Sequence, residues 1–289
     1  MKVCGFTIVR NAIKYDYPVV ESIRSILPLC DKVVVAAGNS DDGTLDLIKS
    51  IDKEKIVIIE TVWDDKLREG GSVLAVETNK AMDAIAADFD WCFYIQADEV
   101  IHENSYLVIQ NAMKKWVDVP EVEGLLFKYH HFWGTYDYLG INRQWYKHEI
   151  RIIRNNKQIR SYRDAQGFRL NSRKLKVKPI DAYIYHYGYV RPPAIMKEKM
   201  KDFSELYHSN DNLKKEVQRI NNFKYEEVDA VKQFTGSHPS ILKKRIEGMV
   251  WSVKIDQKQF KMNLKDRLLF VFERLFKYRL FEYRNYIKI

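Results

Sequence analysis

Short apolar runs alternate with amphipathic segments through the first hundred residues of the chain. The runs are dense in Val, Ile, Phe and Tyr, which is typical of buried strands. They lie at residues 3–9, 32–37, 55–60 and 91–95. Apolar residues at helical spacing predict three helices between these runs. One begins near Pro18, a short one begins at Leu45, and the third covers residues 72–87 with Ser72 as a candidate N-cap. This alternation predicts an α/β fold with a mainly parallel sheet flanked by helices.

The pattern changes after residue 100. A helix is expected over residues 104–116, and strands are expected over residues 124–129, 150–153 and 182–187. From about Pro192 onward only helical patterns occur, interrupted between Gly236 and Pro239. We therefore expect the sheet to be followed by a helical C-terminal extension.

Composition agrees with a globular protein, since 46% of the 289 residues are hydrophobic and 30% are charged. Three scattered cysteines, Cys4, Cys30 and Cys92, form neither a disulfide framework nor a zinc-binding pair. No apolar run approaches the length of a membrane-spanning helix or of a signal-peptide core. We expect a cytoplasmic protein.

The net charge of +9 is unevenly distributed. Residues 1–100 hold 11 basic and 18 acidic side chains, whereas residues 101–289 hold 37 and 21. An acidic first hundred residues disfavours a nucleic-acid binder, so no nucleic-acid partner is expected. The basic second part needs another explanation.

Candidate chemistry gathers where the predicted parallel strands end, because ligands of open α/β sheets bind outside the carboxyl ends of the strands. The Gly-rich fingerprints of dinucleotide-binding and P-loop proteins are absent from the sequence. Asp98 and Glu99 directly follow the fourth apolar strand. A carboxylate there can hold a divalent cation against substrate phosphates, and the alternative is that both are ordinary loop acids.

Three motifs carry a family resemblance. The first strand ends near Thr7, Arg10 and Asn11, residues 40–44 read SDDGT after the second strand, and residues 96–98 read QAD after the fourth. The chain thereby resembles the nucleotide-sugar half of family 2 glycosyltransferases of the GT-A fold. It is most similar to the bacterial branch related to lipopolysaccharide-core glycosyltransferases, in which Asp-Glu also closes the last motif. The resemblance covers about the first 100 residues well and continues more loosely to about residue 190.

The resemblance implies a GT-A-like fold and an inverting transfer of a sugar from a nucleotide-diphosphate donor. The acceptor would be a hydroxyl of a cell-surface glycan or its lipid-linked precursor, and the cofactor would be Mn²⁺ or Mg²⁺. It also implies three parts, namely a nucleotide-sugar-binding half (1–100), an acceptor-side half of the same domain (101–191) and a helical C-terminal region (192–289). Asp98 would be the principal metal ligand, completed by the late histidine His186. The alternative for His186 is a hydrogen-bonded histidine in an aromatic strand.

The residues expected to bind the nucleotide sugar are Thr7, Arg10, Asn11, Asn39, Asp42, Asn79, Gln96, Asp98 and Arg191. Two positions depart from the family pattern. Ala37 and Gly38 replace an acidic pair that contacts the base, so Asn39 or backbone groups would take over that contact. Gln96 replaces the first Asp of the D-x-D motif, and its amide can hydrogen-bond ribose or a metal-bound water.

Inversion requires a general base for the acceptor hydroxyl, and two carboxylates are candidates. We favour Asp164, which lies in a polar loop after a strand, over Glu149, which opens a strand between basic neighbours. The aromatic stretch 130–138 is either a floor for an acceptor sugar or a second small core.

The C-terminal segment 258–289 is basic, with apolar residues at helical spacing from Leu264 to Tyr283. It could lie on an anionic membrane at the inner face, or pack on the catalytic domain or on a partner subunit of a homo-oligomer. Two other functions are weighed against the glycosyltransferase. A sugar nucleotidyltransferase would need a Gly-rich loop after the first strand, where residues 9–12 read VRNA. A non-catalytic nucleotide- or carbohydrate-binding protein would be compatible with the altered residues Ala37, Gly38 and Gln96.

Overall fold

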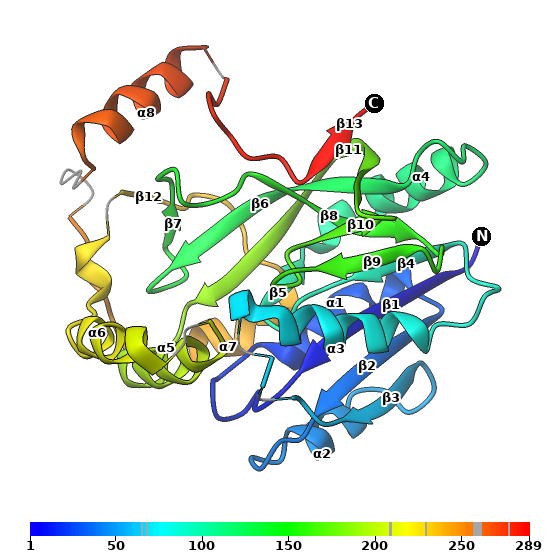
Figure 1. Ribbon diagram of the computed structural model, residues 1–289, viewed down its shortest axis with the longest axis horizontal. Helices are drawn as coiled ribbons and strands as arrows, with labels where there is room; N and C mark the ends of the chain where they lie inside the picture. Colours follow the sequence, from blue (N-terminus) through cyan, green and yellow to red (C-terminus); the bar gives the residue numbers. More distant parts are fainter. Residues whose placement is uncertain (65, 68, 208–209, 229, 257–261, 277) are drawn as a thin grey trace.

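A computed structural model describes all residues of the chain except 65, 68, 208–209, 229, 257–261 and 277. Its central sheet has the strand order β3-β2-β1-β4-β8-β6-β11-β10-β9 (Figure 1). The strands are β1 (Val3–Val9), β2 (Lys32–Gly38), β3 (Ile56–Thr61), β4 (Trp91–Tyr94), β5 (Glu99–Ile101), β6 (Gly124–Trp133), β7 (Tyr138–Gly140), β8 (His148–Arg154), β9 (Ile159–Tyr162), β10 (Gly167–Leu170), β11 (Arg173–Tyr189), β12 (Val231–Gln233) and β13 (Tyr286–Lys288). The helices are α1 (Val19–Ile26), α2 (Thr44–Lys49), α3 (Ser72–Asp83), α4 (Tyr106–Trp116), α5 (Pro193–Tyr207), α6 (Asn210–Asn221), α7 (Lys243–Glu247) and α8 (Leu264–Phe276).

The sheet is parallel from β3 to β11 except for β8, which is antiparallel to both of its neighbours. The carboxyl ends of β1, β2, β4, β6 and β11 therefore meet at one edge. The expected α/β plan, a mainly parallel sheet flanked by helices, is confirmed, and it agrees with the GT-A-like arrangement that the resemblance implies.

Apolar faces of the strands form the two main cores. Val33, Val35 and Phe93 pack on one face with Ile23 of α1, while Val34 and Cys92 pack on the other with Met82 of α3. Both faces of these strands are covered, which explains why their sequences read as continuous apolar runs rather than alternating ones. The aromatic stretch 130–138 belongs to two smaller buried clusters, so it is a second small core rather than a sugar-binding floor.

Strand β5 links the turn after β4 to β11. It runs antiparallel to β11, with Glu99 opposite His186 and Ile101 opposite Ile184. The turn that precedes β5 is closed by the hydrogen bond from the Glu99 amide to the Gln96 carbonyl at 3.0 Å. This short strand therefore fixes the end of the fourth apolar run against the end of β11.

Three predictions about local structure were wrong. Ser72 is the first residue of α3 rather than its cap, which is Gly71 in the left-handed region at φ 71°. The C-terminal region is not purely helical, because β12 pairs with β7 and β13 pairs with the start of β11. The helical spacing predicted from Leu264 to Tyr283 ends at Phe276. Within the described residues, no helix is long and apolar enough to cross a membrane.

Candidate functional site

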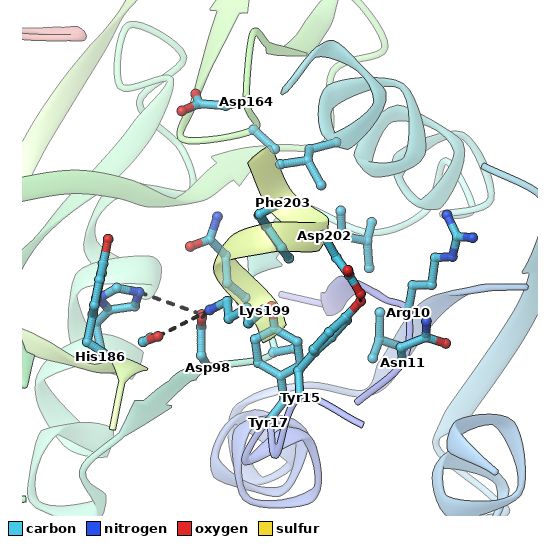
Figure 2. A pocket seen from close by; sticks show the side chains of 18 of the residues that line it. Arg10, Asn11, Tyr15, Tyr17, Asp98, Asp164, His186, Lys199, Asp202 and Phe203 are labelled. Atoms are coloured by element: carbon cyan, nitrogen blue, oxygen red, sulfur yellow. Dashed lines mark hydrogen bonds and ion pairs between the residues drawn. The ribbon is translucent and has the colours of Figure 1, made fainter. Parts of the chain in front are cut away.

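A pocket of about 760 Å³ opens at the edge where the parallel strands end. One wall is made by Arg10 and Asn11 after β1 and a second by residues 96–98 after β4. A third is made by residues at the end of β11, namely His186, Gly188 and Tyr189. Helix α5 closes the pocket with Lys199, Asp202 and Phe203 (Figure 2). The pocket thus lies where ligands of open α/β sheets are expected.

Asp98 and His186, separated by 88 positions, meet because of the β5–β11 pairing. The Tyr187 amide donates to the Asp98 carbonyl at 2.7 Å, which holds the two segments side by side. The Asp98 carboxylate then lies 3.7 Å from His186 Nε2 and 3.5 Å from Lys199 Nζ (Figure 2). Burial opposes the charge of Asp98, but the basic side chains of His186, Lys199 and Arg191, in that order, keep its pKa below the ordinary value.

A second histidine sets the protonation of His186. His131 Nε2 lies 2.8 Å from the carbonyl oxygen of Tyr146, and because a carbonyl only accepts, this nitrogen carries the proton. Burial lowers the pKa of His131 well below its ordinary value, so the ring is neutral and its Nδ1 is an acceptor. His186 Nδ1, at 3.0 Å, is therefore the donor. Burial also lowers the pKa of His186, which leaves a lone pair on its Nε2 facing Asp98.

The facing lone pairs of Asp98 and His186 fit a divalent cation. A metal-ligating histidine usually donates its other ring N–H to a fixed acceptor, as His186 does to His131. Among the described residues no group of three or more His, Cys, Asp or Glu side chains could hold a metal by itself. Mg²⁺ and similar ions are commonly bound by one or two protein ligands together with substrate phosphates, and this arrangement suits that mode.

Glu99, the other acid of the pair, is structural. Its carboxylate is fully buried and accepts two hydrogen bonds from Arg151, both at 2.8 Å, and one from the Tyr129 hydroxyl at 2.7 Å. The Gln96 amide donates to the same carboxylate at 3.1 Å, which tightens the turn before Asp98. Glu99 and Arg151 therefore position the Asp98 turn, and sequence reasoning missed the arginine.

Two cations lie beside Asp98. Lys199 donates to the Gly188 carbonyl at 3.1 Å, and burial, followed by the nearby Arg191, lowers its pKa to about 7. Arg191 is fully buried and donates to the Tyr15 carbonyl at 2.8 Å, while its Nε and Nη2 have no hydrogen-bond partner among the described residues. Sequence reasoning missed Lys199, although Met196, Lys199, Met200 and Phe203 share the helical spacing of one face of α5.

The two candidate bases occupy different environments. Asp164 lines the pocket on a wall away from Asp98 (Figure 2), in a turn where Arg163 and Ala165 both have positive φ. Glu149 is buried behind the pocket, where its Oε1 accepts from Gln166 Nε2 at 3.2 Å. Burial raises the pKa of Glu149 to about 8. Of the two carboxylates, Asp164 is the one that a pocket ligand would contact.

The remaining predicted residues divide into two groups. Arg10, Asn11 and Gln96 line the pocket with Asp98. The others lie outside the pocket lining. Thr7 is buried in β1, and Asn39 accepts from the Trp63 amide at 3.2 Å. Asp42 accepts from the Lys14 amide at 2.7 Å, and Asn79 accepts from the Ser161 amide at 2.8 Å.

No protein-family model matches the chain, and no curated protein matches it. Similar solved structures exist. TarS from S. aureus is 17% identical over 77% of this chain and 43% of that chain, with a TM-score of 0.40. Mannosyl-3-phosphoglycerate synthase from Rubrobacter xylanophilus is 19% identical over 45% and 41%, with a TM-score of 0.31.

Glucosyl-3-phosphoglycerate synthase from Mycobacterium tuberculosis, in complex with Mn²⁺, uridine diphosphate and phosphoglyceric acid, is 16% identical over 45% of this chain and 43% of that chain, with a TM-score of 0.30. The chain spans less than half the length of each of these three proteins. Similarity at this level says nothing about the substrate of this chain, which has to be inferred from its own side chains.

Proposed function

We propose that the chain is an inverting glycosyltransferase that takes a sugar from a nucleoside-diphosphate donor. The observation that carries the proposal is the facing pair of Asp98 and His186, with Lys199 beside it, at the carboxyl ends of a parallel sheet. A diphosphate bound there would contact a cation site and the basic side chain of Lys199, and the buried Arg191 behind the lining adds positive charge. The acceptor would be a hydroxyl of a cell-surface glycan or its lipid-linked precursor.

A divalent cation held by Asp98 and His186, Mn²⁺ or Mg²⁺, would act as a Lewis acid on the departing diphosphate. The side chains of the protein would then have separate tasks. Arg10 and Asn11 line the donor side of the pocket, and Asp202 joins α5 to the loop after β1 by accepting from Lys14 Nζ at 2.7 Å and from the Tyr15 hydroxyl at 2.5 Å.

Asp164 is proposed as the base that removes the proton of the acceptor hydroxyl. It lines the same pocket on a wall away from Asp98, so an acceptor hydroxyl placed between Asp164 and the donor sugar could attack the anomeric carbon from the face opposite the diphosphate. Asp164 would take the hydroxyl proton as the bond from the anomeric carbon to the diphosphate breaks. Glu149 is less suited, because its carboxylate does not line the pocket and is protonated at neutral pH, given a pKa of about 8.

The test is a screen of nucleoside diphosphates and their sugars by thermal shift, with and without Mn²⁺, followed by a transfer assay with the donor that stabilises the protein. We expect Asp98→Asn to lose metal-dependent stabilisation and transfer. Asp164→Asn should lose transfer by at least about a hundredfold and keep donor binding. Metal-independent nucleotide binding without transfer would instead support a non-catalytic nucleotide-binding protein.

A further inference from the structure

Helix α8 is amphipathic, but its apolar face is exposed and its buried face carries a charged side chain. Apolar side chains at the spacing i, i+4, i+7 and i+11 are exposed, namely Leu264, Leu268, Val271 and Leu275. Leu268 and Leu275 are 64% and 71% exposed. Among the residues of this helix, all of which the structure describes, the one buried side chain is a carboxylate, Glu273. A helix that packs on a protein core buries its apolar face, whereas the apolar side chains of this helix are exposed or at most half-buried.

Ion pairs fasten α8 instead. The Glu273 carboxylate accepts from Arg143 at 3.1 Å, contacts Lys147, and lies 3.5 Å from Arg279. The buried Arg279 also donates to the Trp145 carbonyl at 2.7 Å. These contacts fix which face of the helix is turned inward, and the leucine face stays exposed. Figure 1 shows α8 at the edge of the molecule.

The exposed apolar surface continues past the end of the helix. Phe276, Tyr278, Phe281 and Tyr283 are all exposed, and Phe281 is 87% exposed. Together with the leucine face of α8 they form what we term the C-terminal apolar face. The row of apolar side chains along one face of α8 indicates an interaction site, because exposed apolar residues are usually scattered singly.

Charge and composition identify the occupant. Lys265, Arg267 and Arg274 are exposed on α8, and its acidic Glu273 is neutralised by the contacts on the buried side. Segment 258–289 as a whole has 9 basic and 3 acidic residues. Leucines and aromatic rings on one side with basic side chains around them are typical of helices that lie in the interface of an anionic bilayer. With 13 residues the helix is too short to span a bilayer.

We propose that the C-terminal apolar face docks onto an anionic lipid surface, with α8 lying in the plane of the interface. This goes beyond the proposed transfer reaction and does not depend on it. Docking would also be linked to the pocket through Glu273, because its partners Arg143 and Lys147 flank Trp145 and Tyr146 in the sequence. Both of these aromatic residues line the pocket.

The test is co-sedimentation of the full chain with vesicles of phosphatidylcholine alone or of equal parts phosphatidylcholine and phosphatidylglycerol. We expect binding to the anionic vesicles only. The double variant Leu268→Glu/Leu275→Glu should bind at least tenfold more weakly, because two anchoring side chains are lost. Replacing Lys265, Arg267 and Arg274 by Gln should weaken binding roughly a hundredfold. The matched control Val62→Glu/Leu107→Glu changes equally exposed apolar residues elsewhere and should bind like the unaltered chain.

Two results would overturn the proposal. One is the absence of binding to anionic vesicles by the unaltered chain, and the other is equal binding by the double variant. The unaltered chain could instead fail to bind vesicles and form a dimer, detected by light scattering, that the variant Leu268→Glu/Leu275→Glu does not form. The occupant of the face would then be a second copy of the chain. All of these variants leave the pocket untouched, so nucleotide binding measured in parallel keeps this test separate from that of the proposed function.

Discussion

At the residue scale, the pairing of His131 with His186 has the most consequence for the site. The two residues lie opposite each other in the register of β6 and β11, so strand pairing brings the rings together. His131 is also stacked between neighbours, with ring centroids 5.0 Å from Trp145 and 5.1 Å from Tyr129. It is therefore held rigidly enough to act as a positioning residue for His186.

Removing the acceptor on His131 should weaken metal binding without touching the pocket. We expect His131→Phe to reduce Mn²⁺ affinity by about 10- to 100-fold in titration calorimetry. His131→Asn, whose amide oxygen can accept from His186, should retain more affinity. His130→Phe is the control, since His130 stacks on Tyr183 at 4.2 Å on the other side of the strand.

The tautomer itself can be observed in the metal-free protein. Long-range ¹H–¹⁵N spectra should show His186 protonated at Nδ1 and bare at Nε2. A spectrum with the proton on Nε2 would contradict the donor role assigned to His186 Nδ1 in its hydrogen bond to His131.

Glu149 makes a separate prediction about pH. Its Oε2 has no hydrogen-bond partner among the described residues, and burial raises its pKa to about 8 from an ordinary value near 4.5. Between these two values the folded state binds a proton that the unfolded chain does not, so this group costs stability as the pH rises. The free energy of unfolding, measured in denaturant, should be lower at pH 8 than at pH 5, and Glu149→Gln should remove this loss. An equal loss in the variant would assign the pH dependence to other groups.

At the scale of elements, α8 and the segment between β7 and β8 form one unit joined by Glu273. Replacing Glu273 by Gln removes the charge that faces the buried side chains of Arg143 and Arg279. Both arginines keep their bonds to backbone carbonyls, but the loss of hydrogen bonding to a charged group costs about 1.5–3 kcal/mol, so amide exchange over residues 143–147 should rise by about tenfold or more.

The control for this prediction is Glu247→Gln. Glu247 pairs with Lys243 on the exposed face of α7, where an ion pair contributes little. Exchange over residues 143–147 that is unchanged in Glu273→Gln would show that α8 is not coupled to the pocket segment.

Elements could be predicted from the sequence where both of their faces are buried. The prediction failed for elements with an exposed face. The apolar run at residues 3–9 matches β1 residue for residue, because both faces of that strand are covered. Strand β11 begins at Arg173, although the sequence predicts a strand only over residues 182–187. In the first half of β11, apolar residues alternate with Lys and Arg, a pattern that is typical of exposed surface. Strand β13 gains its conformation only from pairing with β11, which no local pattern reveals.

At the scale of the whole molecule, the pocket lies where the acidic and basic parts of the chain meet. Asp98 comes from the first hundred residues, whereas His186 and Lys199 come from the basic remainder. The motif at residues 96–98 predicts Asp98 and the late position predicts His186 as site residues, and both side chains line the pocket. Lys199 and His131 could not be predicted in the same way, because their roles depend on which faces of α5 and β6 turn toward the pocket.

The division into residues 1–100, 101–191 and 192–289 stays a prediction, although the pocket draws side chains from all three ranges. A truncated chain that ends before α5 would lack Lys199 and Asp202. The three ranges therefore need not bind the donor independently.

The most direct test of the central claim is the coupling between a nucleoside diphosphate and Mn²⁺ in titration calorimetry. If Asp98 and His186 hold a cation that the diphosphate shares, each ligand must raise the affinity for the other by the same factor, which we expect to exceed tenfold. Asp98→Asn should abolish the coupling in both directions. Equal nucleoside-diphosphate affinity with and without Mn²⁺ in the unaltered chain would contradict the account.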